Sequence, residues 1–271
     1  MGSYDLLGNV AIVKFDTSKR RKVTAKEKKA FASKVLKTHK SVSTVLEKSG
    51  NFSGRLRKQK TLWILGEKTK EVLYRENGCE FRFNVDDCYF SSRLSTDREE
   101  VANQVKKSRK KECVLVMFSG TGIYGIVIGK IAGARVSKIV CVEINRKCNK
   151  YALENVRRNK LQEKVKIVQG DVRKKIGKGN EIRGKFDRIV MARPNLSDDF
   201  LDVAFKATRK GTIINYHAFC HELEMKAGVI EELIMEKAKK AKKKVKILKI
   251  KKAGEIAPYK FRYRVDFKIV K

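Results

Sequence analysis

The chain has 271 residues, and its 65 Lys and Arg residues outnumber its 30 Asp and Glu residues, which gives a formal net charge of +35. So large an excess of positive charge predicts a polyanionic partner such as nucleic acid, although a uniformly lysine-rich surface is the alternative. No apolar run is long enough to span a membrane and the first residues lack a secretory signal, so membrane and secreted classes are not indicated and we expect a cytoplasmic protein.

The first part of the chain, residues 1–97, predicts a small α+β domain. Its residues alternate between apolar and polar in short stretches, and one longer stretch carries apolar residues at helical spacing. The Asn77-Gly78 pair is typical of a tight hairpin turn. In chain order we expect a strand at 8–15, a helix at 25–37, and strands at 42–46, 61–65, 71–75 and 79–85.

The second part, residues 98–271, alternates between strands and helices. The predicted strands are 113–116, 138–142, 165–169, 188–191, 211–216, 245–250 and 262–269, and the predicted helices are 101–108, 126–134, 147–159, 198–207 and 223–244. This order is typical of an α/β fold with a doubly wound sheet, which holds its ligand at the carboxyl ends of the strands. Six cysteines without C-x-x-C spacing indicate free thiols, and we expect no metal site.

A glycine turn follows the first strand of this second part. Residues 117–125 read M-F-S-G-T-G-I-Y-G, and Glu143 ends the next predicted strand. Glycines allow the backbone to approach a nucleotide, and a carboxylate at that place can accept hydrogen bonds from ribose hydroxyls. A dinucleotide or a purely structural role fits the glycines alone. Phe118 before Gly120, a third strand that ends in Gly170-Asp171, and a closing pair of strands favour S-adenosylmethionine.

Several segments then resemble one family. C-Y-F-S-S-R-L-S-T-D-R-E at 88–99 is similar to the Y-F-S-P-R-L-A-T-E-R segment of archaeal and eukaryotic tRNA (guanine-37-N1)-methyltransferases. H-K-S-V-S-T-V-L at 39–46, S-G-R-L-R at 53–57, E-N-V-R-R-N-K at 154–160 and A-P-Y-K-F-R-Y-R-V-D-F-K-I at 257–269 also resemble that family. The resemblance covers almost the whole chain, and we expect no counterpart of the small N-terminal elbow-binding domain of many archaeal members.

The resemblance implies a class I, Rossmann-like methyltransferase that moves a methyl group from S-adenosylmethionine to N1 of guanosine 37. N1 carries a proton that a base must remove, and the family's carboxylate corresponds to Asp97, which is one methylene shorter than the usual Glu. Arg57 corresponds to an arginine that steadies the charge on guanine O6. Tyr89 and Arg93 are expected to line the pocket of an extruded base.

The cofactor contacts expected from the glycine turn and from the resemblance come from residues spread over four strand ends. They are Arg98, Phe118, Gly120, Gly122, Glu143, Ile144, Asp171, Val172 and Pro194, with Asn195 beside the substrate. The implied partner is the anticodon stem-loop of tRNA, bound by a monomer.

The sequence departs from the family at three positions. Val116 replaces an acid in the first strand of the second part, Ala192 replaces an Asn before Pro194, and Asp97 replaces Glu. These departures leave a catalytically degenerate tRNA-binding paralogue as an alternative. Two further alternatives come from related enzymes, namely an aminocarboxypropyltransferase of the wybutosine pathway and a methyltransferase of wyosine intermediates.

Overall fold

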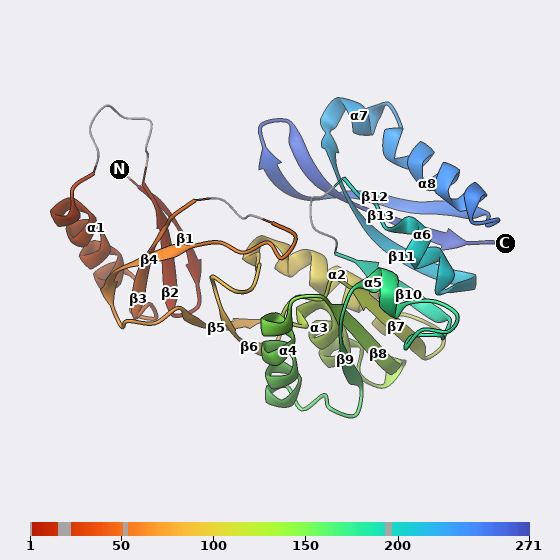
Figure 1. Ribbon diagram of the computed structural model, residues 1–271, viewed down its shortest axis with the longest axis horizontal. Coiled ribbons are helices and arrows are strands. Elements are labelled where there is room, and N and C mark those ends of the chain that lie inside the picture. Colours follow the sequence, from red (N-terminus) through yellow and green to blue (C-terminus); the bar gives the residue numbers. More distant parts are fainter. Residues whose placement is uncertain (1, 16–22, 51–53, 193–196) are drawn as a thin grey trace.

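The computed structural model describes residues 2–15, 23–50, 54–192 and 197–271. A four-stranded sheet forms the N-terminal end of the molecule (Figure 1), with the order β1 (Ser3–Leu7), β2 (Val10–Lys14), β3 (Thr44–Lys48) and β4 (Thr61–Gly66). Helix α1 (Ala25–Thr38) packs on it and begins at a capping box between Thr24 and Glu27. The predicted helix is confirmed, whereas the predicted strand 8–15 is β2 alone, and β1 before it was not predicted.

A hairpin of β5 (Glu71–Glu76) and β6 (Cys79–Asn84) follows, with the predicted turn at Asn77-Gly78, where both residues have positive φ of 50° and 69°. Its outer edge is closed by two asparagines of helix α4 (Arg146–Arg158). Asn155 and Asn159 each accept from a backbone N–H of β6 and donate to a carbonyl of the same strand, at 2.7–3.1 Å. In packing terms the hairpin therefore belongs with the second part of the chain, whose core it shares.

The second part is a seven-stranded mixed sheet with the order β12-β13-β11-β10-β7-β8-β9. Its strands are β7 (Glu112–Met117), β8 (Val136–Glu143), β9 (Val165–Gln169), β10 (Phe186–Met191), β11 (Thr208–His221), β12 (Val245–Ala257) and β13 (Lys260–Ile269). β7 to β11 pair in parallel, and β13 is antiparallel to both neighbours. The doubly wound α/β fold is thus confirmed, and the strand order reverses beside β7, where such sheets bind ligands.

Helices cover both faces of this sheet (Figure 1). One core packs α2 (Ser95–Lys106), α3 (Ile123–Ala132) and α4 on the first face, and the other packs α6 (Leu201–Lys206) and α8 (Val229–Lys240) on the second. The predicted helix 223–244 is two helices, α7 (Glu222–Lys226) and α8, because Gly228 at φ 78° breaks it. The short helices α5 (Val172–Lys175), η1 (Ser92–Leu94) and η2 (Gly133–Arg135) complete the fold. Within the described residues, no helix is long and apolar enough to cross a membrane.

The third glycine of the turn has a packing role. A Cβ built on Gly125 would lie 2.4 Å from Cys141 Sγ and 3.2 Å from Ile139 Cγ2, so only glycine lets α3 approach β8 this closely. This part of the glycine pattern therefore holds the helix to the sheet.

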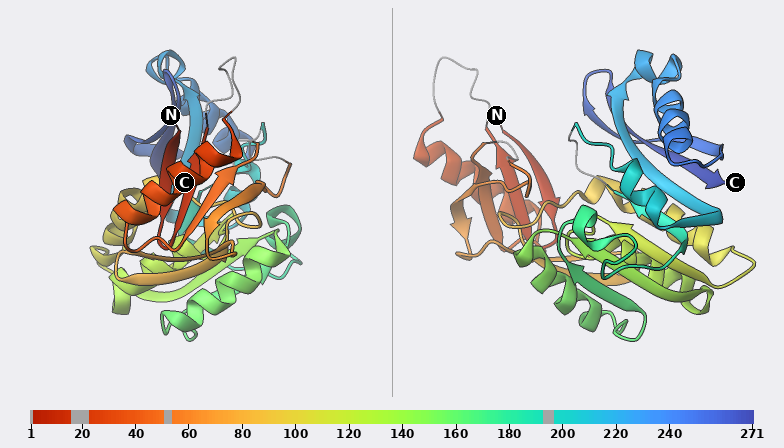
Figure 2. Two further views of the ribbon diagram at one scale, coloured as in Figure 1. Left: turned by 90° about the vertical axis from the view of Figure 1, so that its left-hand side faces the viewer. Right: turned by 45° about the vertical axis from the view of Figure 1, so that its right-hand side comes forward.

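Strands β11 and β12 are much longer than predicted, whereas β13 exceeds the predicted strand 262–269 by only two residues. Their far ends rise together beyond the rest of the sheet, with α7 and α8 alongside, as both views of Figure 2 show. This extension carries Phe219, Glu255 and Arg262 to the pocket described below.

Candidate functional site

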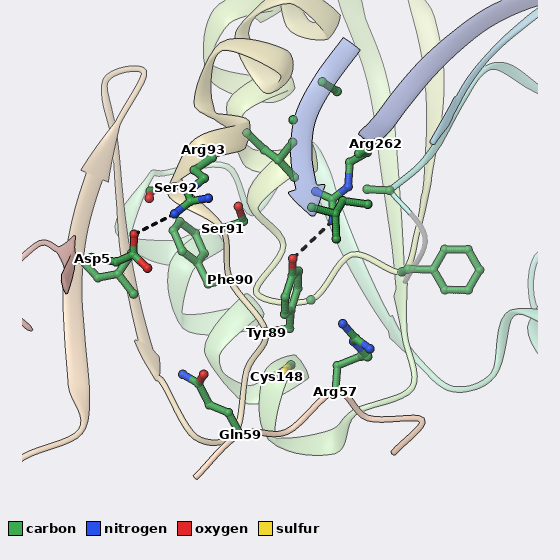
Figure 3. A pocket seen from close by; sticks show the side chains of 18 of the residues that line it. Asp5, Arg57, Gln59, Tyr89, Phe90, Ser91, Ser92, Arg93, Cys148 and Arg262 are labelled. Carbon is green, nitrogen blue, oxygen red and sulfur yellow. Dashed lines mark hydrogen bonds and ion pairs between the residues drawn. The ribbon is translucent and has the colours of Figure 1, made fainter. Parts of the chain in front are cut away.

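A pocket of about 500 Å³ lies at the carboxyl ends of β7 and β8. It is bounded by four parts of the chain, which are the N-terminal sheet, the segment 55–59, the segment 89–94, and the extension of β11–β13 (Figure 3). Of the residues predicted from the sequence, those that line it are Arg57, Tyr89, Arg93, Phe118, Gly120, Glu143 and Ile144. The turn for the cofactor and the segment for the target base therefore share one cavity.

The glycine turn is held by the carboxylate that was predicted to face it. Glu143 accepts hydrogen bonds from the backbone N–H of Gly120 at 2.9 Å and of Asn145 at 2.8 Å. Burial raises the pKa of Glu143, and these backbone donors oppose the rise. Phe118 has φ 61°, an uncommon backbone state for a bulky residue that often marks a binding site. The conformation of the turn is therefore fixed by the hydrogen bond to Glu143 and by the backbone geometry at Phe118.

The segment before Tyr89 is tied to the start of α4. The Asp87 carbonyl accepts from Asn145 Nδ2 at 2.7 Å, and its carboxylate pairs with Lys147 at 2.8 Å. The Sγ atoms of the buried Cys88 and Cys148 are 2.7 Å apart. As a result, a Cβ built on Gly120 would face the carbonyl oxygen of Tyr89 at 3.9 Å, so the two functional segments are neighbours.

Two arginines from distant parts of the chain meet at Tyr89. The Arg57 guanidinium lies 5.7 Å from the centroid of the Tyr89 ring, and Arg262 donates to the Tyr89 hydroxyl at 3.3 Å. Figure 3 shows both arginines on the same side of Tyr89, toward opposite ends of its ring. Arg57 itself has φ 51°. This wall of the pocket combines one aromatic ring with two permanent positive charges.

Two ion pairs join distant segments of the chain around the pocket. Arg93 pairs with Asp5 of β1 at 3.1 Å, and Arg55 pairs with Asp171 at 2.5 Å. Burial would raise the pKa of Asp171, but the N–H of Arg173 and the Arg55 side chain hold it below its usual value. Asp171, a predicted cofactor contact, also caps α5 and is not among the residues that line the pocket in this structure.

Asp97, the predicted base, lies outside the pocket lining in this structure. This residue lies in the first turn of α2 with a side chain only 4% exposed. Its carboxylate accepts from Tyr124 at 2.7 Å, from His217 at 3.0 Å and from Arg264 at 2.5 Å. Burial alone would raise the pKa of Asp97, but the hydrogen bonds from His217 and Tyr124 and the charge of Arg264 lower it below its usual value. A carboxylate held in this way is a weak proton acceptor.

Arg98 is likewise held in a structural contact. It is buried and pairs with Glu76 of β5 through two 2.5 Å hydrogen bonds, and it donates to the Ser91 carbonyl at 3.1 Å. It therefore joins the hairpin to the segment 89–94, and it is not among the residues that line the pocket in this structure. Gly122 and Val172 do not line it either, since Gly122 forms the N-cap of α3 and Val172 packs in the core. Pro194 and Asn195 lie outside the described residues.

Arg262, Phe219 and Glu255 line the pocket and were not predicted as site residues. Arg262 lies inside the segment 257–269 that resembles the family, so the sequence drew attention to this segment. Nothing in the residue spacing indicated which side chains of the strand face the pocket. Only the sheet order, which places β13 beside β11, brings it to Tyr89.

One acidic group within the described ranges has the spacing of a metal site, namely Asp198, Asp199 and Asp202. Arg173 pairs with Asp198 at 2.6 Å and with Asp202 at 2.8 Å, and Lys237 pairs with Asp199 at 2.7 Å. Each of the three carboxylates thus pairs with one of these two cations, so the cluster is explained as a set of ion pairs that connects α5, α6 and α8.

Comparison with known proteins gives one consistent family. The model of the TRM5/TYW2 methyltransferase domain matches residues 72–248. Trm5b of Pyrococcus abyssi, a tRNA (guanine(37)-N(1))-methyltransferase, is 31% identical over 98% of this chain and 74% of its own length. Taw22 of Nanoarchaeum equitans, a tRNA (guanine(37)-N(1))/4-demethylwyosine(37)-methyltransferase, is 27% identical over 99% of this chain and its whole length. The crystal structure of the Pyrococcus abyssi Trm5b superposes with a TM-score of 0.83 at 30% identity, over 99% of this chain and 75% of that one.

Proposed function

Because this chain belongs to the TRM5/TYW2 methyltransferase family, we propose that it transfers a methyl group from S-adenosylmethionine to N1 of guanosine 37 in tRNA. The observation that carries the proposal is the single pocket in which the glycine turn faces the Tyr89 segment. Transfer to a nucleobase needs the methyl donor and the target base in one cavity, in contact and shielded from water.

The residues of the glycine turn fit the cofactor. Gly120 exposes backbone to the pocket, and Phe118, Glu143 and Ile144 surround it. Bound S-adenosylmethionine supplies an electrophilic methyl group whose bond to sulfur breaks as the bond to N1 forms. The turn and Glu143 would bind and orient it.

The target side fits a nucleobase on a polyanionic chain. Tyr89 offers a ring for stacking, Arg57 and Arg262 offer charge beside it, and the chain as a whole carries a net charge of +35. A structure of aTrm5 in complex with tRNALeu has the same fold, with a TM-score of 0.81. We propose that this protein binds the anticodon stem-loop of tRNA, acts as a monomer and works in the cytoplasm.

The direct test is mass spectrometry of nucleosides from tRNA incubated with the protein and labelled S-adenosylmethionine. The expected product is 1-methylguanosine at position 37, with a label that comes from the methyl group alone. A label in an aminocarboxypropyl group, or on a wyosine intermediate only, would replace the proposal with one of the alternatives. Unmodified tRNA together with intact tRNA binding would indicate a binding paralogue.

Glu143→Ala is expected to weaken S-adenosylmethionine binding by at least about tenfold, since a hydrogen bond to a charged group contributes about 1.5–3 kcal/mol. The variant removes the acceptor for Gly120 and the predicted ribose acceptor together. Calorimetric titration measures the effect, with the exposed Glu163→Gln as the control. Because the pKa of Glu143 is raised, the wild-type affinity should fall with acidification earlier than an ordinary glutamate would allow. An unchanged affinity in Glu143→Ala would remove this residue from the cofactor site.

A further inference from the structure

Arg262 is a pocket residue whose hydrogen-bonding capacity the protein itself does not use up. It lies on β13, its terminal nitrogen reaches the Tyr89 hydroxyl at 3.3 Å, and its guanidinium stacks 5.0 Å from the Phe219 ring centroid. Its Nε is buried and has no hydrogen-bond partner among the described residues. A buried N–H without an acceptor costs free energy, so a bound group with an acceptor oxygen would relieve that cost.

The carboxylates near the pocket do not compensate the positive charge of the Arg262 guanidinium. Asp97 is held by three donors outside the cavity, and Asp5 pairs with Arg93. Glu143 is bonded to the glycine turn. Glu255, at the end of β12, lines the same cavity but is solvent-exposed, so water screens its charge. The wall formed by Arg57, Tyr89 and Arg262 is therefore electropositive.

We propose that Arg262 binds the carbonyl oxygen of the target purine and acts together with Arg57 as a pair of guanidinium donors that stabilises the deprotonated base. The proposal rests on the proposed function and deepens it. Arg57 and Arg262 contact the ring and the hydroxyl of the same tyrosine, so a base stacked on this wall lies within reach of both. An arginine fork is suited to such an oxygen because it is planar and permanently charged.

The chemistry balances with water as the acceptor of the N1 proton. The N1–H bond breaks and its proton passes to water, while the electron pair is shared between N1 and O6. Charge on O6 is then the quantity that Arg57 and Arg262 stabilise, as donors do in an oxyanion hole. N1 keeps the electron pair that forms the new bond to carbon. In this scheme Asp97 is not the proton acceptor, which agrees with its three hydrogen-bond donors outside the pocket.

The test compares Arg262→Gln and Arg262→Lys with Lys268→Gln, an exposed position at the far end of the same strand. Single-turnover methylation should fall about 10²–10³-fold in Arg262→Gln, with the rise of rate with pH displaced to higher pH, and Arg262→Lys should recover only part of the loss. Affinity for S-adenosylhomocysteine should stay within about threefold, because the arginine contacts the base rather than the cofactor. Lys268→Gln should behave as wild type.

Binding provides a readout that does not depend on turnover. The wild type should bind tRNA with guanosine 37 more tightly than tRNA with adenosine 37, which lacks the oxygen, and Arg262→Gln should reduce that ratio toward one. Loss of S-adenosylhomocysteine affinity instead would assign Arg262 to the cofactor carboxylate and overturn the proposal. Equal losses for both tRNAs would make it a phosphate contact and overturn it as well. A wild type that methylates no tRNA would refute the proposed function, whereas an active Arg262→Gln would refute only this inference.

Discussion

Asp97→Asn is expected to lower the free energy of unfolding by about 3 kcal/mol, because it leaves the buried Arg264 guanidinium without one of its anionic partners. Urea unfolding followed by circular dichroism measures the change. The control is Glu99→Gln, an exposed carboxylate on the same helix, which should change stability by less than about 0.5 kcal/mol.

The pH dependence of stability gives a second readout for Asp97. The pKa of this carboxyl is lowered in the folded protein, so its stabilising contribution is complete above the unfolded value of about 3.9 and is lost as the pH falls below it. The difference in stability between wild type and Asp97→Asn should therefore be constant near neutral pH. It should shrink on acidification below about pH 4.

Activity then separates the structural role of Asp97 from the role that the resemblance implied. At a temperature where the variant is folded, Asp97→Asn should keep its single-turnover rate within about tenfold, whereas loss of a general base costs about 10²–10⁴-fold. A stable variant with a rate reduced by that larger factor would restore Asp97 as the base. It would also require the side chain to leave its three donors in the tRNA complex.

The second large effect is expected for Arg57→Gln, which should lower the single-turnover rate by about 10²–10³-fold while leaving cofactor affinity unchanged. The reason is its place beside Tyr89, where it can stabilise charge on the target base. Lys58→Gln, the exposed neighbouring position, is the matched control. A rate loss that disappears at saturating tRNA would show instead that Arg57 contributes only to RNA affinity.

The two guanidinium groups should also be coupled. If Arg57 and Arg262 stabilise one oxygen, the loss in the double variant Arg57→Gln/Arg262→Gln should differ from the product of the two single losses by more than about fivefold, which corresponds to about 1 kcal/mol. If the rate loss of the double variant equals the product of the two single losses, Arg57 and Arg262 act on separate parts of the substrate.

Asp97 belongs to a buried polar network that crosses the sheet. Arg264 also donates to Asp266 at 3.0 Å, Asp266 accepts from Asn215 and Gln104, and Arg188 reaches the same Gln104 at 2.8 Å. Such a network is stable only when all its members have hydrogen-bond partners, so the loss of one member weakens the hydrogen bonds of the others. It also fixes α2 against β11 and β13, and thereby places the Tyr89 segment that precedes this helix.

Much of this molecule could be predicted from local patterns. Alternation of strands and helices is a property of short windows, and it predicted the doubly wound sheet, the glycine turn and the position of Glu143 at the end of a strand. The hairpin turn at Asn77-Gly78 was equally local, because those two residues tolerate positive φ. The resemblance to the methyltransferase family predicted pocket roles for Tyr89 and Arg57, and both residues line the pocket.

Other features depended on which segments the fold brings together. Hydrophobic periodicity shows which face of a helix is buried, but not which polar side chains of other elements contact that face. The ion pairs of Asp97 with Arg264 and of Arg98 with Glu76 could therefore not be predicted from the sequence of α2 alone. Arg262 reaches Tyr89 across 173 positions of sequence because β13 inserts antiparallel beside β11. The sequence by itself determined the fold and the family, and only the tertiary structure decided which charged side chains face the pocket and which are neutralised in the core.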